Sequence, residues 1–231
     1  CRTAKSQETD LVKMKGIKIF YDGSLGSETA LLSHCYCQKN HSGKANWSFD
    51  DIAEVLKQTW SQGFEVSVHV IGDQAVHDIV SIAREVSQKN YVGRLNLEHA
   101  QVVRPETIQL MKPLHIRCHM QPCHWLSDRK WLKAKLGDLY ENVFPWEALR
   151  LAKIPISFGC DSPVEPPSFL RNLEALELSP QEGIREYRGR IVETHAHPSE
   201  DFAPDSFSVF EDQQLKEVVF KGKRIFTSFS G

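Results

Sequence analysis

A chain of 231 residues with 41% hydrophobic residues is long enough to bury a sizeable core, as one large domain or as a small pair. Its 28 basic residues nearly balance its 30 acidic ones, which gives no reason to expect a nucleic-acid or anionic-membrane partner. The sequence has no apolar run near the roughly 20 residues of a membrane span, and its six cysteines lack zinc-finger spacing, so we expect a cytoplasmic protein with reduced thiols.

The first predicted element is a strand at about residues 16–22, which carries a lysine and ends in a glycine-rich turn. Ile17 and Ile19 point to one side of this strand and Lys18 points to the other. A buried ammonium group must lose its proton, be paired or react, and a neutral lysine can act as a nucleophile or combine with carbon dioxide to form a carbamate. The alternative is a lysine at a strand end that extends its ammonium group into water.

Helices and strands then alternate along the chain. A long loop at residues 24–43 precedes a helix that starts after Ser48 and ends at Gly63, and a second helix covers about residues 74–88. This alternation is typical of a parallel sheet with helices on its faces. The other inner strands are predicted at about residues 65–71, 94–98, 115–119 and 154–159, and the other helices after Arg104, within 125–136 and from Pro145.

Potential ligands follow several of these strands. His69, His99 and Asp161 each lie at or near the end of an apolar run. Functional groups of a (β/α) barrel lie at the C-terminal ends of its strands, so we expect these residues and Lys18 around one mouth. A lone buried histidine is usually a satisfied core residue, but two that end separate strands could converge on a metal. The carboxylate of Asp161 would lie at the end of a buried strand. There it would need a cation or several hydrogen-bond donors to offset the cost of its desolvation.

Two further histidine motifs each have two interpretations. His124, which ends the stretch that begins at Gln121, could polarise a substrate carbonyl, or the stretch could be a turn with incidental polar groups. His195 and His197 have the spacing of two ligands from one strand, but they lie in a polar tract.

The alternation of helices and strands fades beyond Pro167. Strand-like stretches at residues 207–210 and 217–226 predict a hairpin or small sheet. We therefore expect a barrel portion at residues 1–175 and a C-terminal segment with a small β unit at residues 176–231.

Five motifs together resemble the amidohydrolase superfamily, and they are most similar to its amidohydrolase-3 branch, which includes N-substituted formamide deformylases. The resemblance covers roughly residues 12–168. The motifs are Lys18-Ile-Phe-Tyr-Asp-Gly-Ser-Leu-Gly-Ser, Val68-His-Val-Ile-Gly-Asp-Gln-Ala-Val, Glu98-His-Ala-Gln, Gln121-Pro-Cys-His and Gly159-Cys-Asp-Ser-Pro-Val-Glu.

This resemblance implies a (β/α)8 TIM barrel that holds one or two divalent metals, usually zinc. Lys18 matches the lysine that carbon dioxide converts to a bridging carbamate, and His69 and His99 match two histidine ligands. Asp161 matches the aspartate that binds metal and carries the proton. A metal-activated hydroxide would then attack the carbonyl of a small amide-type substrate at a carbon–nitrogen bond other than a peptide bond.

The sequence departs from this family in one respect, because no strand with a His-x-His pair precedes Lys18 and only five inner strands are predicted where a closed barrel has eight. We expect the chain to be the C-terminal, catalytic part of a longer hydrolase or a shortened relative. An open barrel of this kind would expose two strand edges and an apolar inner face, which favours aggregation or a homo-oligomer. The alternatives are an inactive barrel-derived binding or regulatory protein, and a barrel enzyme with Lys18 as a Schiff-base nucleophile.

Overall fold

The computed structural model describes residues 14–179, 207–211 and 214–227. In these residues five parallel strands form one sheet in the order β1-β2-β3-β4-β5, which confirms the five predicted inner strands close to their expected bounds. Strands that are consecutive in the sequence are neighbours in this sheet and run parallel. A helix between two such strands brings the chain back to the start of the next strand. The strands are β1 (Gly16–Phe20), β2 (Glu65–Val70), β3 (Leu95–His99), β4 (Ile116–Met120) and β5 (Ile156–Phe158).

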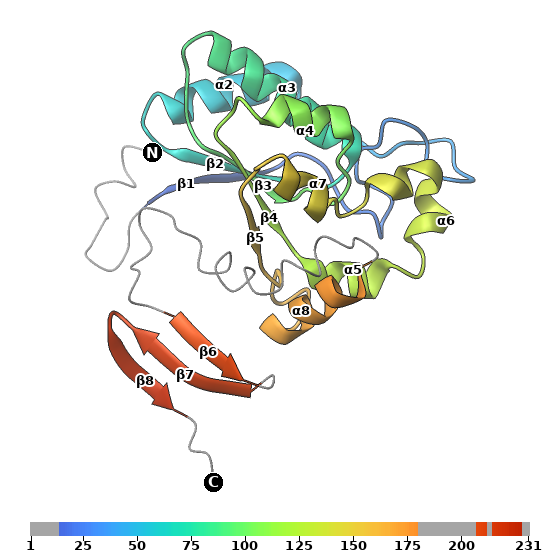
Figure 1. Ribbon diagram of the computed structural model, residues 1–231. Helices are drawn as coiled ribbons and strands as arrows, with labels where there is room; N and C mark the ends of the chain where they lie inside the picture. The colour runs from blue at the N-terminus through green and yellow to red at the C-terminus, as the bar shows by residue number, and fades with distance from the viewer. Residues whose placement is uncertain (1–13, 180–206, 212–213, 228–231) are drawn as a thin grey trace.

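Four helices cover one face of this sheet (Figure 1). The first of them begins after Ser48, whose hydroxyl accepts a hydrogen bond from the Asp51 amide at 3.2 Å, and it buries Ile52 and Leu56 against the core. Predicted helix starts near residues 48, 74, 105 and 145 are therefore confirmed. The helices are α2 (Phe49–Trp60), α3 (Asp73–Gln88), α4 (Pro105–Met111) and α7 (Trp146–Leu151).

The strand alternation decides which side chains face the helices. In β2, Val66, Val68 and Val70 are fully buried, while Ser67 and His69 between them are only partly buried. Side chains in a strand alternate between the two faces, so the valines pack under the helices and His69 lies on the opposite face.

The face opposite the helices is polar. Lys18 is in register with Ser67, Ser67 with Asn96, and Asn96 with Arg117. Glu65 on the same face pairs with Arg94 at 2.8 Å, and it accepts a hydrogen bond from Asn96 at 3.0 Å. The expected apolar inner face is therefore wrong, because the strand positions on this side carry charged and amide groups that bond to one another across the sheet.

The sheet does not close into a barrel within the described ranges, where β1 and β5 form its two edges. The described residues thus form a parallel α/β core of the TIM-barrel type in an open sheet. No helix in the described part of the chain is long and apolar enough to span a bilayer.

Helices α5 and α8 pack together at the C-terminal end of the sheet (Figure 1). One further helix, which the sequence analysis did not predict, follows Pro167: Ser168 caps α8 by accepting a hydrogen bond from the Arg171 amide at 3.3 Å, and Asn172 and Leu176 are buried. The elements at this end are α5 (Pro122–Asp128), α6 (Leu132–Leu136), the 3-10 helix η1 (Gly137–Asn142) and α8 (Phe169–Leu178).

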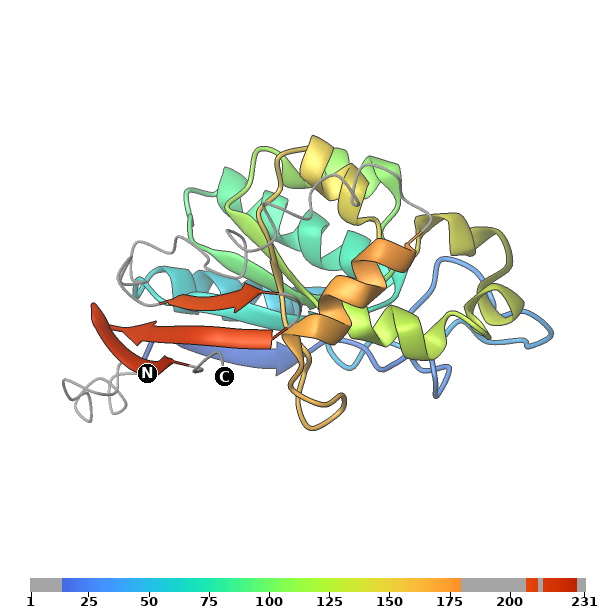
Figure 2. The same ribbon diagram turned by 60° about the horizontal axis from the view of Figure 1, so that its bottom comes forward.

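A three-stranded antiparallel sheet confirms the predicted small β unit, with β7 between β6 and β8 (Figure 2). The rings of Phe169 and Phe210 lie 5.2 Å apart. His195 and His197 lie outside the described residues. The strands are β6 (Phe207–Glu211), β7 (Gln214–Phe220) and β8 (Lys223–Thr227).

Candidate functional site

Three histidines lie side by side at the C-terminal edge of the parallel sheet. His69 comes from the end of β2, His99 is the last residue of β3, and His124 lies in the first turn of α5 after β4. The ring centroids of His69 and His99 are 4.5 Å apart, and those of His99 and His124 are 6.1 Å apart. Of the four side chains expected at one mouth, His69 and His99 thus lie together, and His124 lies beside them.

The charges of Lys18 and Asp161 act on this row of imidazoles. Burial lowers the pKa of His69, and the charge of Lys18 lowers it further while that of Asp161 opposes the shift. Burial and then the neighbouring His69 lower the pKa of His99 to about 4. Burial also lowers the pKa of His124, against the charge of Asp161. All three imidazoles are therefore neutral near pH 7, which is the form that binds metals.

Hydrogen bonds fix which nitrogen of His99 and of His69 carries the proton. The Nδ1 atom of His99 lies 2.8 Å from the amide oxygen of Gln121, whose amide nitrogen donates to the His119 carbonyl at 3.0 Å. The Nε2 atom of His69 lies 3.0 Å from the Gly23 carbonyl oxygen. An oxygen acceptor requires an N–H donor, so lone pairs remain on Nε2 of His99 and Nδ1 of His69.

His124 has the complementary arrangement. The amide nitrogen of Gln101 donates to Nδ1 of His124 at 3.2 Å. Nε2 of His124 therefore carries the hydrogen, and it is buried without a hydrogen-bond partner in the described structure. A buried N–H group without a partner is costly to the fold, so it is suited to donate to an oxygen of a bound molecule.

Asp22 holds the loop over the sheet edge, a role that the sequence analysis missed. Its buried carboxylate accepts the backbone N–H groups of Leu31, Ile71 and Gly72 at 2.9, 3.0 and 2.9 Å. Burial raises the pKa of Asp22 to about 7, although the three amide donors act to lower it. The carbonyl of Gly23, the next residue, receives the His69 hydrogen bond, so Asp22 indirectly positions that imidazole. An aspartate at the end of an apolar strand was the signal in the sequence.

Glu98 and His119, which the sequence analysis did not identify, form a pair on the same face as His69. Glu98 is in register with both His69 and His119, and its carboxylate lies 3.1 Å from Nδ1 of His119. Burial acts to raise the pKa of Glu98, but the hydrogen bond from His119 and the charges of His119 and Lys18 lower it overall. The available signal was the position of Glu98 and His119 on the same side of two predicted neighbouring strands.

The expected burial of Asp161 is wrong, and of the two interpretations of Lys18 the one with its ammonium group in water is confirmed. Lys18 is exposed, with its Nζ 5.0 Å from the centroid of the Phe20 ring, because it lies on the face opposite the helices. Asp161 is also exposed, because it lies in the turn beyond β5. Its φ of 52° and the φ of 76° at His99 are unusual for residues with side chains, and such backbone conformations cluster at functional sites.

The described residues contain no group of three His, Cys, Asp or Glu side chains that could hold a metal ion as it stands. This count does not include lysine, so it does not consider Lys18. The rings of His69 and His99 have their centroids 4.5 Å apart. The ligand roles of Lys18, His69, His99 and Asp161 stay predictions.

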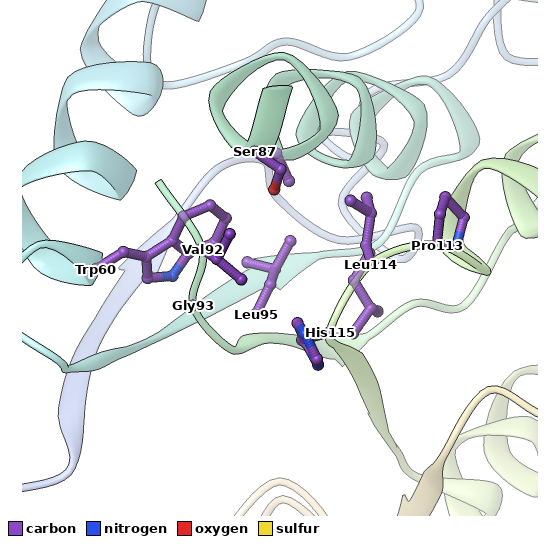
Figure 3. Close-up of a pocket in the computed structure, with 10 residues that line it drawn as sticks. Trp60, Ser87, Val92, Gly93, Leu95, Pro113, Leu114 and His115 are labelled. Atoms are coloured by element: carbon purple, nitrogen blue, oxygen red, sulfur yellow. The ribbon is translucent and has the colours of Figure 1, made fainter. Parts of the chain in front are cut away.

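A separate hollow of about 210 Å³ lies at the other end of the strands, where β3 and β4 begin (Figure 3). It is mainly apolar, and it contains none of the predicted site residues. Its lining includes Trp60, Ser87, Val92, Leu95, Leu114 and His115.

Comparisons with known proteins show which family this chain resembles. Residues 2–178 match a protein-family model described as the amidohydrolase family. YtcJ of Bacillus subtilis, which carries the name of an amidohydrolase, is 33% identical over 171 residues. Protein LONG AFTER FAR-RED 3 of Arabidopsis thaliana is 30% identical over 154 residues.

A solved structure shares the fold over most of the chain. The crystal structure of an uncharacterized metal-dependent hydrolase from Pyrococcus furiosus has a TM-score of 0.71 and 29% identity, and the match covers 81% of this chain and 40% of that one. The matches to YtcJ and LONG AFTER FAR-RED 3 cover 72% and 64% of this chain, but only 32% and 26% of those relatives. The chain thus spans about a third or less of the length of the curated relatives that it matches.

Proposed function

Because this chain belongs to the amidohydrolase family, we propose that it is the catalytic C-terminal part of a metal-dependent hydrolase that acts on carbon–nitrogen bonds other than peptide bonds. The observation that carries this proposal is the row of His69, His99 and His124 at the C-terminal sheet edge, within the electrostatic reach of Asp161. The structural neighbour from Pyrococcus furiosus, which is named as a metal-dependent hydrolase, supports the same class.

The donor atoms at the sheet edge fit a divalent metal. Neutral imidazoles with a free lone pair at Nδ1 of His69 and Nε2 of His99 are borderline ligands, and each is oriented by a hydrogen bond from its other nitrogen. The carboxylate of Asp161 and a carbamate formed from Lys18 and carbon dioxide would add oxygen ligands. This donor set suits one or two zinc ions. A bound metal would supply Lewis-acid polarisation of an amide carbonyl and of water.

The chain's own residues divide the remaining tasks. Asp161 is exposed at the rim, where its carboxylate can take a proton from the attacking water and deliver it to the leaving nitrogen. The unpartnered Nε2–H of His124 can donate to the carbonyl oxygen as negative charge develops there. The substrate we propose is a small amide, such as an N-acyl or N-substituted formamide compound.

Other parts of the proposal concern the whole protein. We propose that further strands pair with the β1 and β5 edges to close the barrel, either in a longer chain or in a homo-oligomer. Residues 1–175 then form the barrel portion and residues 176–231 the segment with the small β unit. The five described cysteines are free thiols, which supports a cytoplasmic location.

The test is hydrolysis of N-formyl and N-acyl amines by a longer protein that includes this chain. We expect turnover with zinc and bicarbonate, loss of turnover with a chelator, and recovery when zinc is returned. A turnover rate that does not change when the chelator is added would contradict metal dependence.

A second candidate is an inactive barrel-derived protein that binds a small molecule or regulates a partner. The finding that favours it is that no described group of three His, Cys, Asp or Glu side chains could hold a metal as it stands. A longer protein that holds no zinc and hydrolyses no amide would favour this candidate. Trapping of a carbonyl compound on Lys18 by borohydride would instead support a Schiff-base enzyme.

A further inference from the structure

Two cysteines lie beside the proposed catalytic residues, one next to His124 and the other next to Asp161. Cys123 is in the first turn of α5, and Cys160 follows β5. Burial, followed by the neighbouring Cys160 side chain, raises the pKa of the Cys123 thiol to about 12. The Cys123 thiol also lies 4.0 Å from the Gly159 carbonyl, the residue before Cys160.

A buried asparagine of α8 holds both cysteines in place. The side-chain oxygen of Asn172 accepts the Cys123 backbone N–H at 3.1 Å, and its amide nitrogen donates to the Gly159 carbonyl at 3.1 Å. The same nitrogen lies 3.6 Å from the Cys160 sulfur, which also accepts the Ser168 backbone N–H at 3.3 Å. One side chain thus contacts the Cys123 backbone and the Cys160 sulfur where α5 and α8 pack together (Figure 2).

We propose that Cys123 and Cys160 form a redox modification site, at which a peroxide converts the two thiols to a disulfide. Cys160 is partly exposed and Cys123 is buried. The oxidant therefore meets Cys160 first, and Cys123 is the residue that resolves the oxidised sulfur.

The chemistry balances with hydrogen peroxide as the oxidant. The sulfur of Cys160 attacks one peroxide oxygen, the O–O bond breaks, and a sulfenic acid and one water molecule form. The sulfur of Cys123 then attacks the sulfur of Cys160, an S–S bond forms as the S–O bond breaks, and the hydroxide leaves with the thiol proton as a second water molecule. The two sulfurs together lose two electrons and the peroxide gains them.

The cross-link would act on the proposed active site through the backbone. A disulfide brings the two sulfurs to about 2.05 Å, closer than any hydrogen-bonded thiol pair. The contraction draws α5 toward the turn after β5, so it displaces the backbone of His124 and Asp161 and moves the Cys160 sulfur away from its Ser168 and Asn172 donors.

The other described cysteines provide internal comparisons. Cys118 is buried in β4, where its neighbours in the register lie on β3 and β5. Cys35 and Cys37 are exposed in the loop before α2 and are two residues apart, so they could oxidise independently. The experiment therefore uses the full chain with Cys35→Ser and Cys37→Ser as its background.

The test is peptide mapping after treatment with hydrogen peroxide, alkylation of the remaining thiols and digestion with trypsin. We expect the peptide of residues 118–129 to be joined to that of residues 154–171, and dithiothreitol to separate them. The link should persist when Cys118→Ala is added and disappear when Cys160→Ser is added. The readout is mass, so the result does not depend on whether the chain hydrolyses amides.

Two results would overturn the proposal. One is a Cys160 that becomes sulfinic acid, or stays reduced, while Cys123 remains open to alkylation. The other is a link between the two peptides that disappears with Cys118→Ala, which would assign the cross-link to Cys118.

Discussion

At the scale of single residues, the place of a side chain in the sheet was easier to predict than its burial. His69 and His99 could be placed at one edge because parallel strands end together, and the structure has their rings 4.5 Å apart. Asp161 was expected to be buried, and for Lys18 both burial and exposure were considered, yet both residues are exposed. Strand alternation tells which face a side chain occupies, but it does not tell what covers that face.

Asp161 gives a direct prediction for catalysis. In a protein that hydrolyses an amide, Asp161→Asn should lower kcat/KM by about 100-fold or more, because an amide keeps the shape of the side chain but cannot take up the proton. Exposed Asp138 offers a matched control, since Asp138→Asn should leave the rate unchanged. Near-normal turnover in the Asp161 variant would remove Asp161 from the proposed mechanism.

Asp128 gives a prediction for stability. Burial, followed by the charge of Glu165, raises the pKa of Asp128 from 3.8 to about 6. Between these pH values the folded chain holds a proton that the unfolded chain has released, so this carboxyl costs stability increasingly as the pH rises through the window. Asp128→Asn should therefore stabilise the fold at pH 7, on the order of 1 kcal/mol after allowance for solvent screening.

The measurement for Asp128 is the free energy of unfolding in urea near pH 4 and at pH 7, with Asp138→Asn as the exposed control. The gain should be present at pH 7 and largely absent near pH 4. An equal gain at both pH values would show that the effect does not come from ionisation of Asp128.

At the scale of elements, apolar periodicity was sufficient for the strands and for the helices that cover them. Helix α8 was missed because the short, proline-rich stretch before Ser168 obscured the cap. What holds α8 in place is also not visible in sequence: the Asn172 side chain bonds to the backbone of Cys123 and of Gly159, both distant in the chain.

This contact predicts the effect of removing the asparagine. Asn172→Ala should cost about 2 kcal/mol of unfolding free energy, because it leaves the buried N–H of Cys123 and the Gly159 carbonyl without their partner. Denaturant unfolding measures the loss. Glu174→Ala, at an exposed position of the same helix, is the control, and an equal effect of the two substitutions would mean that the Asn172 bonds do not hold α8.

At the scale of the whole molecule, the parallel α/β core was predictable from the order of its elements, but the polar character of the face opposite the helices was not. The rule that strands alternate does not require the inner face to be apolar, and here Asn96, Glu65 and Arg94 bond to one another on it. Such a face can remain hydrated when no further strand pairs with β1 or β5.

The open sheet leads to a prediction for the isolated chain. Assayed with zinc and bicarbonate against N-formyl and N-acyl amines, this chain alone should show little turnover, and a longer protein that supplies further barrel strands should be active. The reason is that ligands and the groups that orient them would be incomplete in the open sheet. Comparable activity in the two would show that the chain completes its own site, and His195 and His197 would then be the first residues to substitute.

The central claim is that His69 and His99 form a metal site, and cobalt(II) binding followed by visible absorption tests it most directly. Bound cobalt should give the weak bands of nitrogen and oxygen ligands without thiolate charge transfer, and the bands should be lost in a His69→Ala, His99→Ala variant. Gln121→Leu, which removes the acceptor that orients His99, should weaken binding about 10- to 100-fold, while Gln109→Leu on the exposed surface of α4 should not. Binding that is unchanged in the double histidine variant would contradict the account.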